Sequence, residues 1–135
     1  MKNLFPCASL SFILLAFTLL TSCGKESYQS AYSYGIFQTA GDLNGFFITD
    51  NYLSSKGVYK DIKIFESETK SENDLKAIAF YNEQIAKIDK SELEALLGNV
   101  NFEFTYAVKS STSNPDEEAP TLASKKYEFI YLVAN

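Results

Sequence analysis

The hydrophobic residues of this 135-residue chain follow three patterns, and each pattern predicts a different kind of segment. Residues 32–39, 58–66 and 100–109 alternate between apolar and polar side chains, which is the period of a strand that buries one face. Residues 69–88 repeat at the spacing of an amphipathic helix. Residues 4–20 are almost continuously apolar. The first two patterns predict a folded domain, and the third predicts a segment outside it.

The first part of the domain is predicted to be a meander of three strands. Glycine, aspartate and asparagine at residues 40–45 indicate a turn, so residues 45–52 are expected to return as a second strand. Another turn at residues 54–57 precedes the third strand, at 58–66. The side chains expected to face the core are Tyr32, Tyr34 and Ile36 in the first strand and Val58, Ile62 and Ile64 in the third.

Two helices are predicted to follow. The first helix, at residues 69–88, has two candidate N-terminal capping pairs, Thr69 with Glu72 and Ser71 with Asp74. The second helix begins after Asp89, which pairs with Glu92 in the same way, and ends at Gly98. The first helix is expected to face the core of the domain with an apolar stripe made of Leu75, Ile78, Ala79, Ile85 and Ala86.

The end of the chain predicts two more strands. Residues 100–109 alternate cleanly, whereas residues 110–124 contain two prolines and three consecutive acids and predict a long loop. Residues 127–133 are apolar on both faces, which is typical of a central strand. The predicted fold is therefore α+β, with one antiparallel sheet of about five strands in the order β-β-β-α-α-β-β and the helices packed on one face. The inward residues of the 100–109 strand are Val100, Phe102, Phe104, Tyr106 and Val108.

The apolar run at residues 4–20 follows Lys2, as in a secretory signal peptide. The run ends in Leu20, Thr21, Ser22 and Cys23, which resemble the lipobox of bacterial lipoproteins. That resemblance implies a signal peptide at 1–22 and a lipid on Cys23. The polar and small residues that follow predict a tether at 23–31, and the length of the rest predicts one globular domain at 32–135. An ordinary cleaved signal or an uncleaved anchor helix are the alternatives.

The cysteine count favours the lipid. Cys7 lies inside the apolar run and would leave with it, so Cys23 would have no partner for an internal disulfide. Two or more acyl chains hold a protein stably at a membrane. Gly24, in place of the aspartate that retains enterobacterial lipoproteins in the inner membrane, favours the outer membrane. Lys25 and Glu26 loosely resemble the export signal of Bacteroidetes surface lipoproteins, so the protein is expected in the periplasm or on the cell surface.

Composition narrows the function classes. The chain carries 17 acidic residues against 12 basic ones, all of them lysines, for a net charge of −5. An acidic surface repels nucleic acid and argues against it as a partner. There is no histidine, which removes the usual general base near neutral pH and the commonest metal ligand. We therefore expect a non-catalytic protein without a cofactor or metal.

Two short patterns carry a possible chemistry. Ser67 and Lys70 have the S-x-x-K spacing of penicillin-binding enzymes, but the partner motifs of that family are absent and chance accounts for the match. Asp116, Glu117 and Glu118 are oxygen ligands of the kind calcium uses. They lack the spacing of a calcium-binding loop, so a solvated charge run is the favoured interpretation.

The candidate partner surfaces are the loop at residues 110–124 and a group of aromatic residues. Tyr59 and Phe65 are predicted to lie on the strand face opposite Ile62 and Ile64, where they would form an exposed patch for a partner. The alternative is that both sheet faces are partly covered and the rings simply pack. The resulting function is a lipid-anchored binding or accessory module for an envelope protein or a glycan. The alternative function is an inhibitor or immunity lipoprotein that neutralises a basic toxin or lysozyme-like enzyme.

Overall fold

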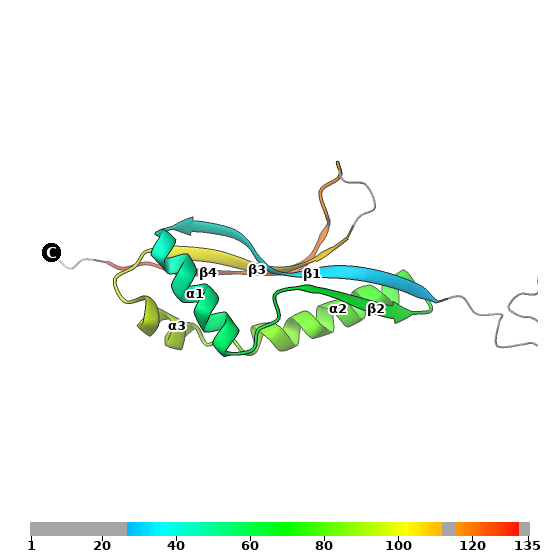
Figure 1. Ribbon diagram of the computed structural model, residues 1–135, viewed down its shortest axis with the longest axis horizontal. Helices are drawn as coiled ribbons and strands as arrows, with labels where there is room; N and C mark the ends of the chain where they lie inside the picture. The colour runs from blue at the N-terminus through cyan, green and yellow to red at the C-terminus, as the bar shows by residue number, and fades with distance from the viewer. Residues whose placement is uncertain (1–26, 112–115, 133–135) are drawn as a thin grey trace, which may run out of the picture.

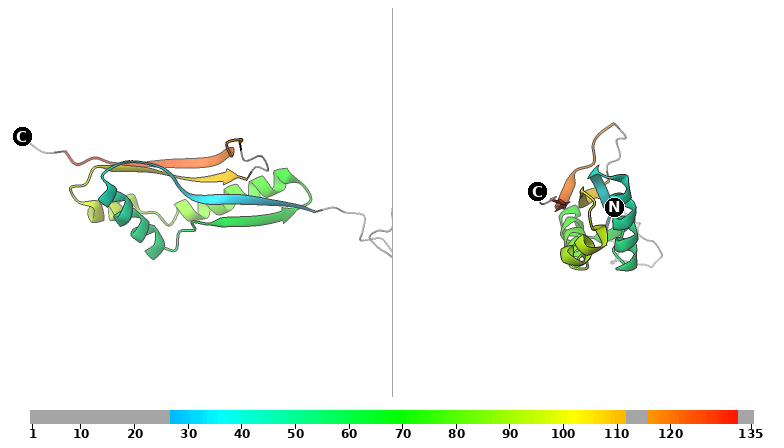
Figure 2. Two further views of the ribbon diagram at one scale, coloured as in Figure 1. Left: turned by 45° about the horizontal axis from the view of Figure 1, so that its top comes forward. Right: turned by 90° about the vertical axis from the view of Figure 1, so that its left-hand side faces the viewer.

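A computed structural model describes residues 27–111 and 116–132. Four strands form one antiparallel sheet in the order β2-β1-β3-β4. The three helices lie on one side of this sheet, and the other face carries no helix (Figures 1 and 2). The elements are β1 (Tyr28–Gly41), α1 (Leu43–Ser55), β2 (Ile62–Ser67), α2 (Lys70–Ile85), α3 (Lys90–Leu97), β3 (Phe102–Ser110) and β4 (Thr121–Phe129).

The α+β class with a single antiparallel sheet is confirmed, with four strands instead of about five. The clean alternation at 100–109 becomes β3, which lies between β1 and β4. Its side chains on the helix-covered face are buried among those of β1 and β4. The cross-strand pairs on this face include Tyr34 with Val108 and Phe104 with Tyr127. The β3 residues buried on this face include Phe102, Phe104, Tyr106 and Val108, as predicted, and Ala107 and Ser110 of the same strand are buried as well.

Two of the predicted helix caps are also confirmed. The side chain of Thr69 accepts a hydrogen bond from the backbone N–H of Glu72 at 3.1 Å, and α2 begins at the next residue. Asp89 accepts from the N–H of Glu92 at 3.1 Å and begins α3 in the same way. These bonds satisfy amide groups that would otherwise have no partner in the first turn.

The predicted hairpin at residues 40–52 is wrong, because α1 occupies most of that segment. Asp42 does not initiate a β-turn; its side chain accepts a hydrogen bond from the N–H of Asn44 at 2.9 Å and caps the helix. Gly45 is not a turn residue either. A Cβ atom at Gly45 would lie 2.6 Å from Cγ of Phe102, so glycine here allows α1 to approach β3 closely.

The face of α2 that is buried differs from the predicted apolar stripe by a rotation about the helix axis. The fully or nearly fully buried residues include Asn73 and Gln84, whereas Leu75 is exposed. The Asn73 amide donates to the carbonyl oxygen of Tyr28 at 2.9 Å, and the Gln84 side-chain oxygen accepts from the N–H of Tyr59 at 2.9 Å. These long-range bonds give partners to the buried Asn73 Nδ2 and Gln84 Oε1 atoms and hold α2 with these two side chains toward the core, whereas the buried Asn73 Oδ1 has no partner among the described residues.

The phase predicted for β2 is also wrong. Ile62 and Ile64 are 57% and 62% exposed, because β2 pairs with β1 in a register that places Lys63 opposite Tyr32. Residues directly opposite each other in a sheet share a face. Since Tyr32 points toward the helices, Lys63 and Phe65 do so as well, and the two isoleucines face the other way. Val58 is buried as predicted, but it precedes the strand.

The ends of the domain differ from the predicted boundaries. β1 begins at Tyr28, so residues 28–31 pair with β2 instead of belonging to a tether. β4 is an edge strand, not a central one, and its N-terminal part lies within the predicted 110–124 loop. The predicted signal peptide and Cys23 lie outside the described residues. Among the residues that are described, no helix is long and apolar enough to cross a membrane.

Buried tyrosines give the core a predicted sensitivity to alkaline pH. Burial raises the pKa of Tyr32 and of Tyr127 from 10 to about 12, and it also raises the pKa of Tyr34, Tyr81 and Tyr106. Because the folded protein holds these protons more tightly than the unfolded chain does, their contribution is complete below pH 10 and is lost as the pH rises through about 12. We expect cooperative unfolding in that window, measured by circular dichroism together with tyrosinate absorbance.

Two conservative substitutions test this assignment. The Tyr127 hydroxyl is buried without a hydrogen-bond partner among the described residues, so Tyr127→Phe should not destabilise the protein at neutral pH and should raise the midpoint of alkaline unfolding. The Tyr34 hydroxyl donates to the Ala77 carbonyl oxygen at 2.9 Å, so Tyr34→Phe should lower the free energy of unfolding by about 1 kcal/mol at neutral pH. Equal neutral-pH stability of the two variants would contradict the assignment.

Candidate functional site

The most distinctive surface is the sheet face that no helix covers. We call the β1, β3 and β4 part of this surface the open face. Cross-strand pairs place its polar side chains side by side, for example Gln38 with Thr105 and Thr105 with Lys126. It consists of Phe37, Gln38, Ala40, Glu103, Thr105, Ala107, Lys109, Thr121, Ser124, Lys126 and Glu128.

Two β-bulges shape the open face. The register of β1 against β3 shifts between Ile36 and Gln38, which inserts Phe37 as an extra residue. The register of β4 against β3 shifts between Val108 and Lys109, which inserts Leu122. A bulge turns two successive side chains out of the simple alternation. Phe37 and Gln38 consequently line the same hollow, which places an aromatic ring beside a carboxamide.

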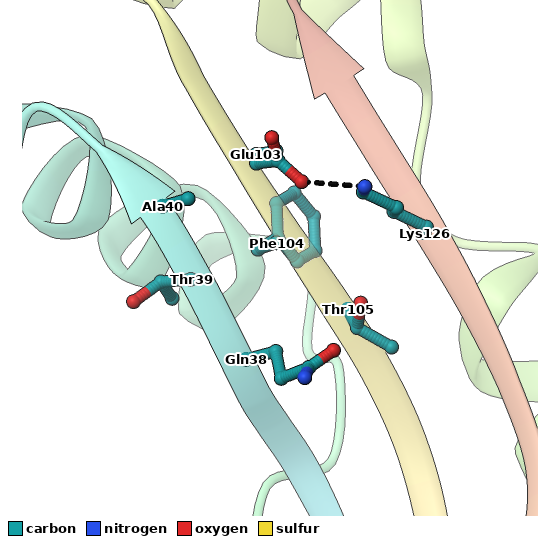
Figure 3. A pocket seen from close by; sticks show the side chains of 7 residues that line it. All are labelled: Gln38, Thr39, Ala40, Glu103, Phe104, Thr105 and Lys126. Carbon is teal, nitrogen blue, oxygen red and sulfur yellow. Dashed lines mark ion pairs between the residues drawn. The ribbon is translucent and has the colours of Figure 1, made fainter.

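The open face contains two adjoining hollows. The first has a volume of about 250 Å³ and lies between β1 and β4 above β3, as Figure 3 shows. The second has a volume of about 340 Å³ and adjoins the connection between β3 and β4. Gln38 and Thr105 line both, so the two form one continuous surface. The other residues that line the first are Thr39, Ala40, Glu103, Phe104 and Lys126, and those that line the second are Phe37, Ala107, Lys109, Glu118, Thr121 and Ser124.

Paired charges cross the first hollow. The Lys126 ammonium lies 2.6 Å from Oε1 of Glu103 and 3.1 Å from Oε2 of Glu128 (Figure 3 draws the pair with Glu103). The hydrogen bonds to Glu103 and then Glu128 raise the pKa of Lys126 above its ordinary value. In the second hollow, the Lys109 ammonium sits 4.8 Å from the centre of the Phe37 ring. The open face therefore offers both signs of charge, an amide, several hydroxyls and one aromatic ring.

These groups are suited to binding a polar ligand. Amide, hydroxyl and carboxylate groups on one surface provide hydrogen-bond donors and acceptors for such a ligand. Among the described residues, no group of three or more histidine, cysteine or acidic side chains is placed to hold a metal ion. The S-x-x-K residues are not paired. Lys70 bonds to both carboxylate oxygens of Asp74 at 3.1 and 3.2 Å, and the buried Ser67 hydroxyl has no hydrogen-bond partner within residues 27–111 and 116–132.

Phe65 lies on the strand face opposite Ile62 and Ile64, as predicted, but this face is the one that the helices cover. Tyr59 and Phe65 are both partly buried against the core, so the expectation that they form an exposed patch is wrong and the alternative of simple packing describes them. Their rings meet the Phe80 ring edge to face, at centroid distances of 5.4 and 6.3 Å. The Lys63 ammonium covers this group, 4.7 Å from the centre of Phe80. Neither side chain is part of the open face.

The open face was only partly visible in the sequence. The outward positions Glu103, Thr105 and Lys109 follow from the alternation at residues 100–109, and their polarity marks a solvent-facing surface. The bulge at Phe37 has no signal in local sequence, because it depends on how β1 pairs with β3. A third hollow, of about 480 Å³, lies at the start of β1 around Tyr28 and Lys70.

Comparison with known proteins gives no relative for this fold and surface. No protein-family model, curated protein or solved structure matches the chain.

Proposed function

We propose that the protein is a lipid-anchored cell-envelope lipoprotein that works as a non-catalytic binding or accessory module for a protein or glycan partner. The observation that supports this proposal is the open face, a hollowed and polar sheet surface left uncovered by all three helices. The anchor is proposed from the lipobox at Cys23, and the location from the residues that follow it. The outer membrane, on its periplasmic or external side, is the expected site.

The position of the open face fits such a module. The chain enters β1 at Tyr28, at one end of an elongated domain, and the open face begins at Phe37, further along the same strand (Figure 1). At ~3.3 Å per residue, the two positions are separated by about 30 Å. A lipid at Cys23 would therefore hold the domain by one end and leave the open face accessible away from the membrane.

The test places a photo-crosslinking amino acid at Thr105, in the middle of the open face, in the lipidated protein in living cells. A matched probe at Glu83, an exposed residue of α2, serves as the control. We expect an adduct from the Thr105 probe only, and we expect a Gln38→Ala, Lys126→Ala double variant to reduce its yield several-fold. Labelled palmitate should be incorporated into the wild type and not into Cys23→Ala.

The outcomes separate the two parts of the proposal. Adducts of equal yield from both probe positions, or from neither, would contradict a binding role for the open face. Palmitate incorporation that persists in Cys23→Ala would contradict the anchor and leave the binding role standing. Mass spectrometry of the Thr105 adduct identifies the partner as protein or glycan.

A second candidate function, the inhibitor or immunity lipoprotein, is favoured by one feature. Residues 116–120, just before β4, rise from the open face (Figure 1), and Glu118 in this segment lines the second hollow. A projecting acidic segment is suited to a cationic cleft, and the resulting complex would weaken as salt screens the charges. A complex with hen-type lysozyme that loses affinity at least tenfold between low and high salt would support this alternative; a salt-insensitive partner would exclude it.

A further inference from the structure

The two edges of the sheet differ in whether their backbone groups are available for pairing. At the β2 edge, the Tyr59 hydroxyl donates to the Ile62 carbonyl oxygen at 2.8 Å, and the Lys76 ammonium donates to the Glu66 carbonyl oxygen at 2.8 Å. The Ile62 N–H donates to the side chain of Asp61 at 2.7 Å. Side chains of the protein itself thus occupy this edge, which is how natural sheets prevent pairing with another chain.

In the part of the chain that the structure describes, the β4 edge has no such protection. No side chain of the described residues hydrogen-bonds to the backbone of residues 121–129, and this nine-residue strand contains no proline. β4 lies at the outside of the sheet in both views of Figure 2. The chain then continues through Ile130, Tyr131 and Leu132, which are 67%, 41% and 80% exposed. An unprotected edge that runs into an exposed apolar segment is a surface that proteins cover.

The charges of β4 indicate which chain covers it. Lys126 and Glu128 lie on the same sheet face, two residues apart. If a second β4 pairs antiparallel about a two-fold axis at Tyr127, each Lys126 lies directly opposite Glu128 of the other copy. Shifting the axis by one residue in either direction while keeping the faces matched places lysine opposite lysine or glutamate opposite glutamate. Opposite charges across a strand pair are favourable and like charges are not, so β4 is complementary to itself in one register.

The same register also covers the apolar segment. The three exposed residues that follow β4 come to lie beside the start of β4 in the second copy, where the side chains are apolar or small. The facing positions are Ile130 with Ser124, Tyr131 with Ala123 and Leu132 with Leu122.

We propose that two copies of this chain pair through their β4 edges, in the register centred on Tyr127, and join their four-stranded sheets into one. The interface is isologous, because each copy contributes the same strand. The helices of both copies lie on the same side, and the two open faces become neighbouring parts of one surface. This inference goes beyond the proposed function and depends neither on the lipid nor on the partner.

Charge reversal tests the register. All core side chains lie between Tyr32 and Phe129, so residues 24–135 contain the whole core and are used for sedimentation velocity over a concentration series. The wild type should sediment as a dimer. Lys126→Glu and Glu128→Lys should each raise the dimer dissociation constant about tenfold or more, and the double variant that exchanges the two charges should restore it. Lys109→Glu, a reversal on β3, is the matched control and should leave the dimer intact.

A crosslink provides a second measurement that does not depend on the charge variants. Residues 123 and 131 are ~26 Å apart along one chain, too far for a disulfide within it. Ala123→Cys combined with Tyr131→Cys should therefore give a disulfide-linked dimer on a non-reducing gel. A wild type that stays monomeric at all concentrations, or a double charge exchange that fails to restore the dimer while folding normally by circular dichroism, would overturn the proposal.

Discussion

Phe104→Ala is expected to lower the free energy of unfolding by about 3–5 kcal/mol, the range found when a large buried aromatic is truncated. Phe104 is 1% exposed in the middle of β3. Its ring stacks on Tyr127 at 4.9 Å and on Phe129 at 6.3 Å, both from β4, and on Phe102 at 6.2 Å. Removing the ring leaves a cavity between two strands and the helices beneath them. Urea unfolding followed by circular dichroism measures the loss.

Phe37→Ala is the matched control for that prediction. It makes the same chemical change in the same sheet, but Phe37 is 39% exposed on the open face and packs against Lys109. We expect a loss of about 1 kcal/mol or less, because exposed positions leave no cavity. Comparable losses in the two variants would contradict the assignment of the helix-covered face as the core and the opposite face as a binding surface.

Gly41→Ala is expected to produce the second large effect, a loss of several kcal/mol or failure to fold. Gly41 ends β1 with φ at 106°, a backbone conformation that residues with a Cβ rarely adopt. A Cβ atom at this position would also overlap the carbonyl oxygen of Asn101, which accepts the N–H of Asp42 at 3.0 Å. Because both obstacles involve backbone, no side-chain movement relieves them.

Gly57→Ala separates the two causes of that effect. Gly57 also has a positive φ, of 69°, but a Cβ atom there would meet nothing within 4 Å. Its substitution should cost only the conformational strain, about 1–2 kcal/mol. Thermal unfolding of both variants gives the comparison. If Gly57→Ala proved as damaging as Gly41→Ala, the contact with Asn101 would not be responsible.

Features that depend on a few neighbouring residues were predictable from the sequence. The caps at Thr69 and Asp89 need only a hydroxyl or carboxylate three residues before an N–H. The strand at 100–109 has one apolar side and one polar side, and β3 buries the apolar side. The α+β class could be predicted because the hydrophobic pattern changes along the chain from the two-residue period of a strand to the period of an amphipathic helix and back.

Features that depend on partners far away in sequence could not be predicted from the sequence. An aspartate followed by a glycine three residues later is compatible with a turn and with the start of a helix. The helix is the structure in which Gly45 packs closely against Phe102. The rotation of α2 agrees with hydrogen bonds to residues far away in sequence, one that Asn73 donates and one that Gln84 accepts. β2 has large side chains on both of its faces, so its sequence does not show which face is buried. The pairing of β2 with β1 determines the buried face.

The candidate site likewise has some features that were predictable from the sequence and others that were not. The sequence by itself determined the polar outward side of β3, the acidic character of the chain and the lipobox at Cys23 on which the proposed anchor rests. Only the tertiary structure decided that no helix covers this side, that a bulge adds Phe37 to it, and that β4 is an unprotected edge while β2 is closed. The physical reason is that a residue's type and spacing fix its local hydrogen bonds, whereas exposure and pairing depend on which distant segments pack beside it.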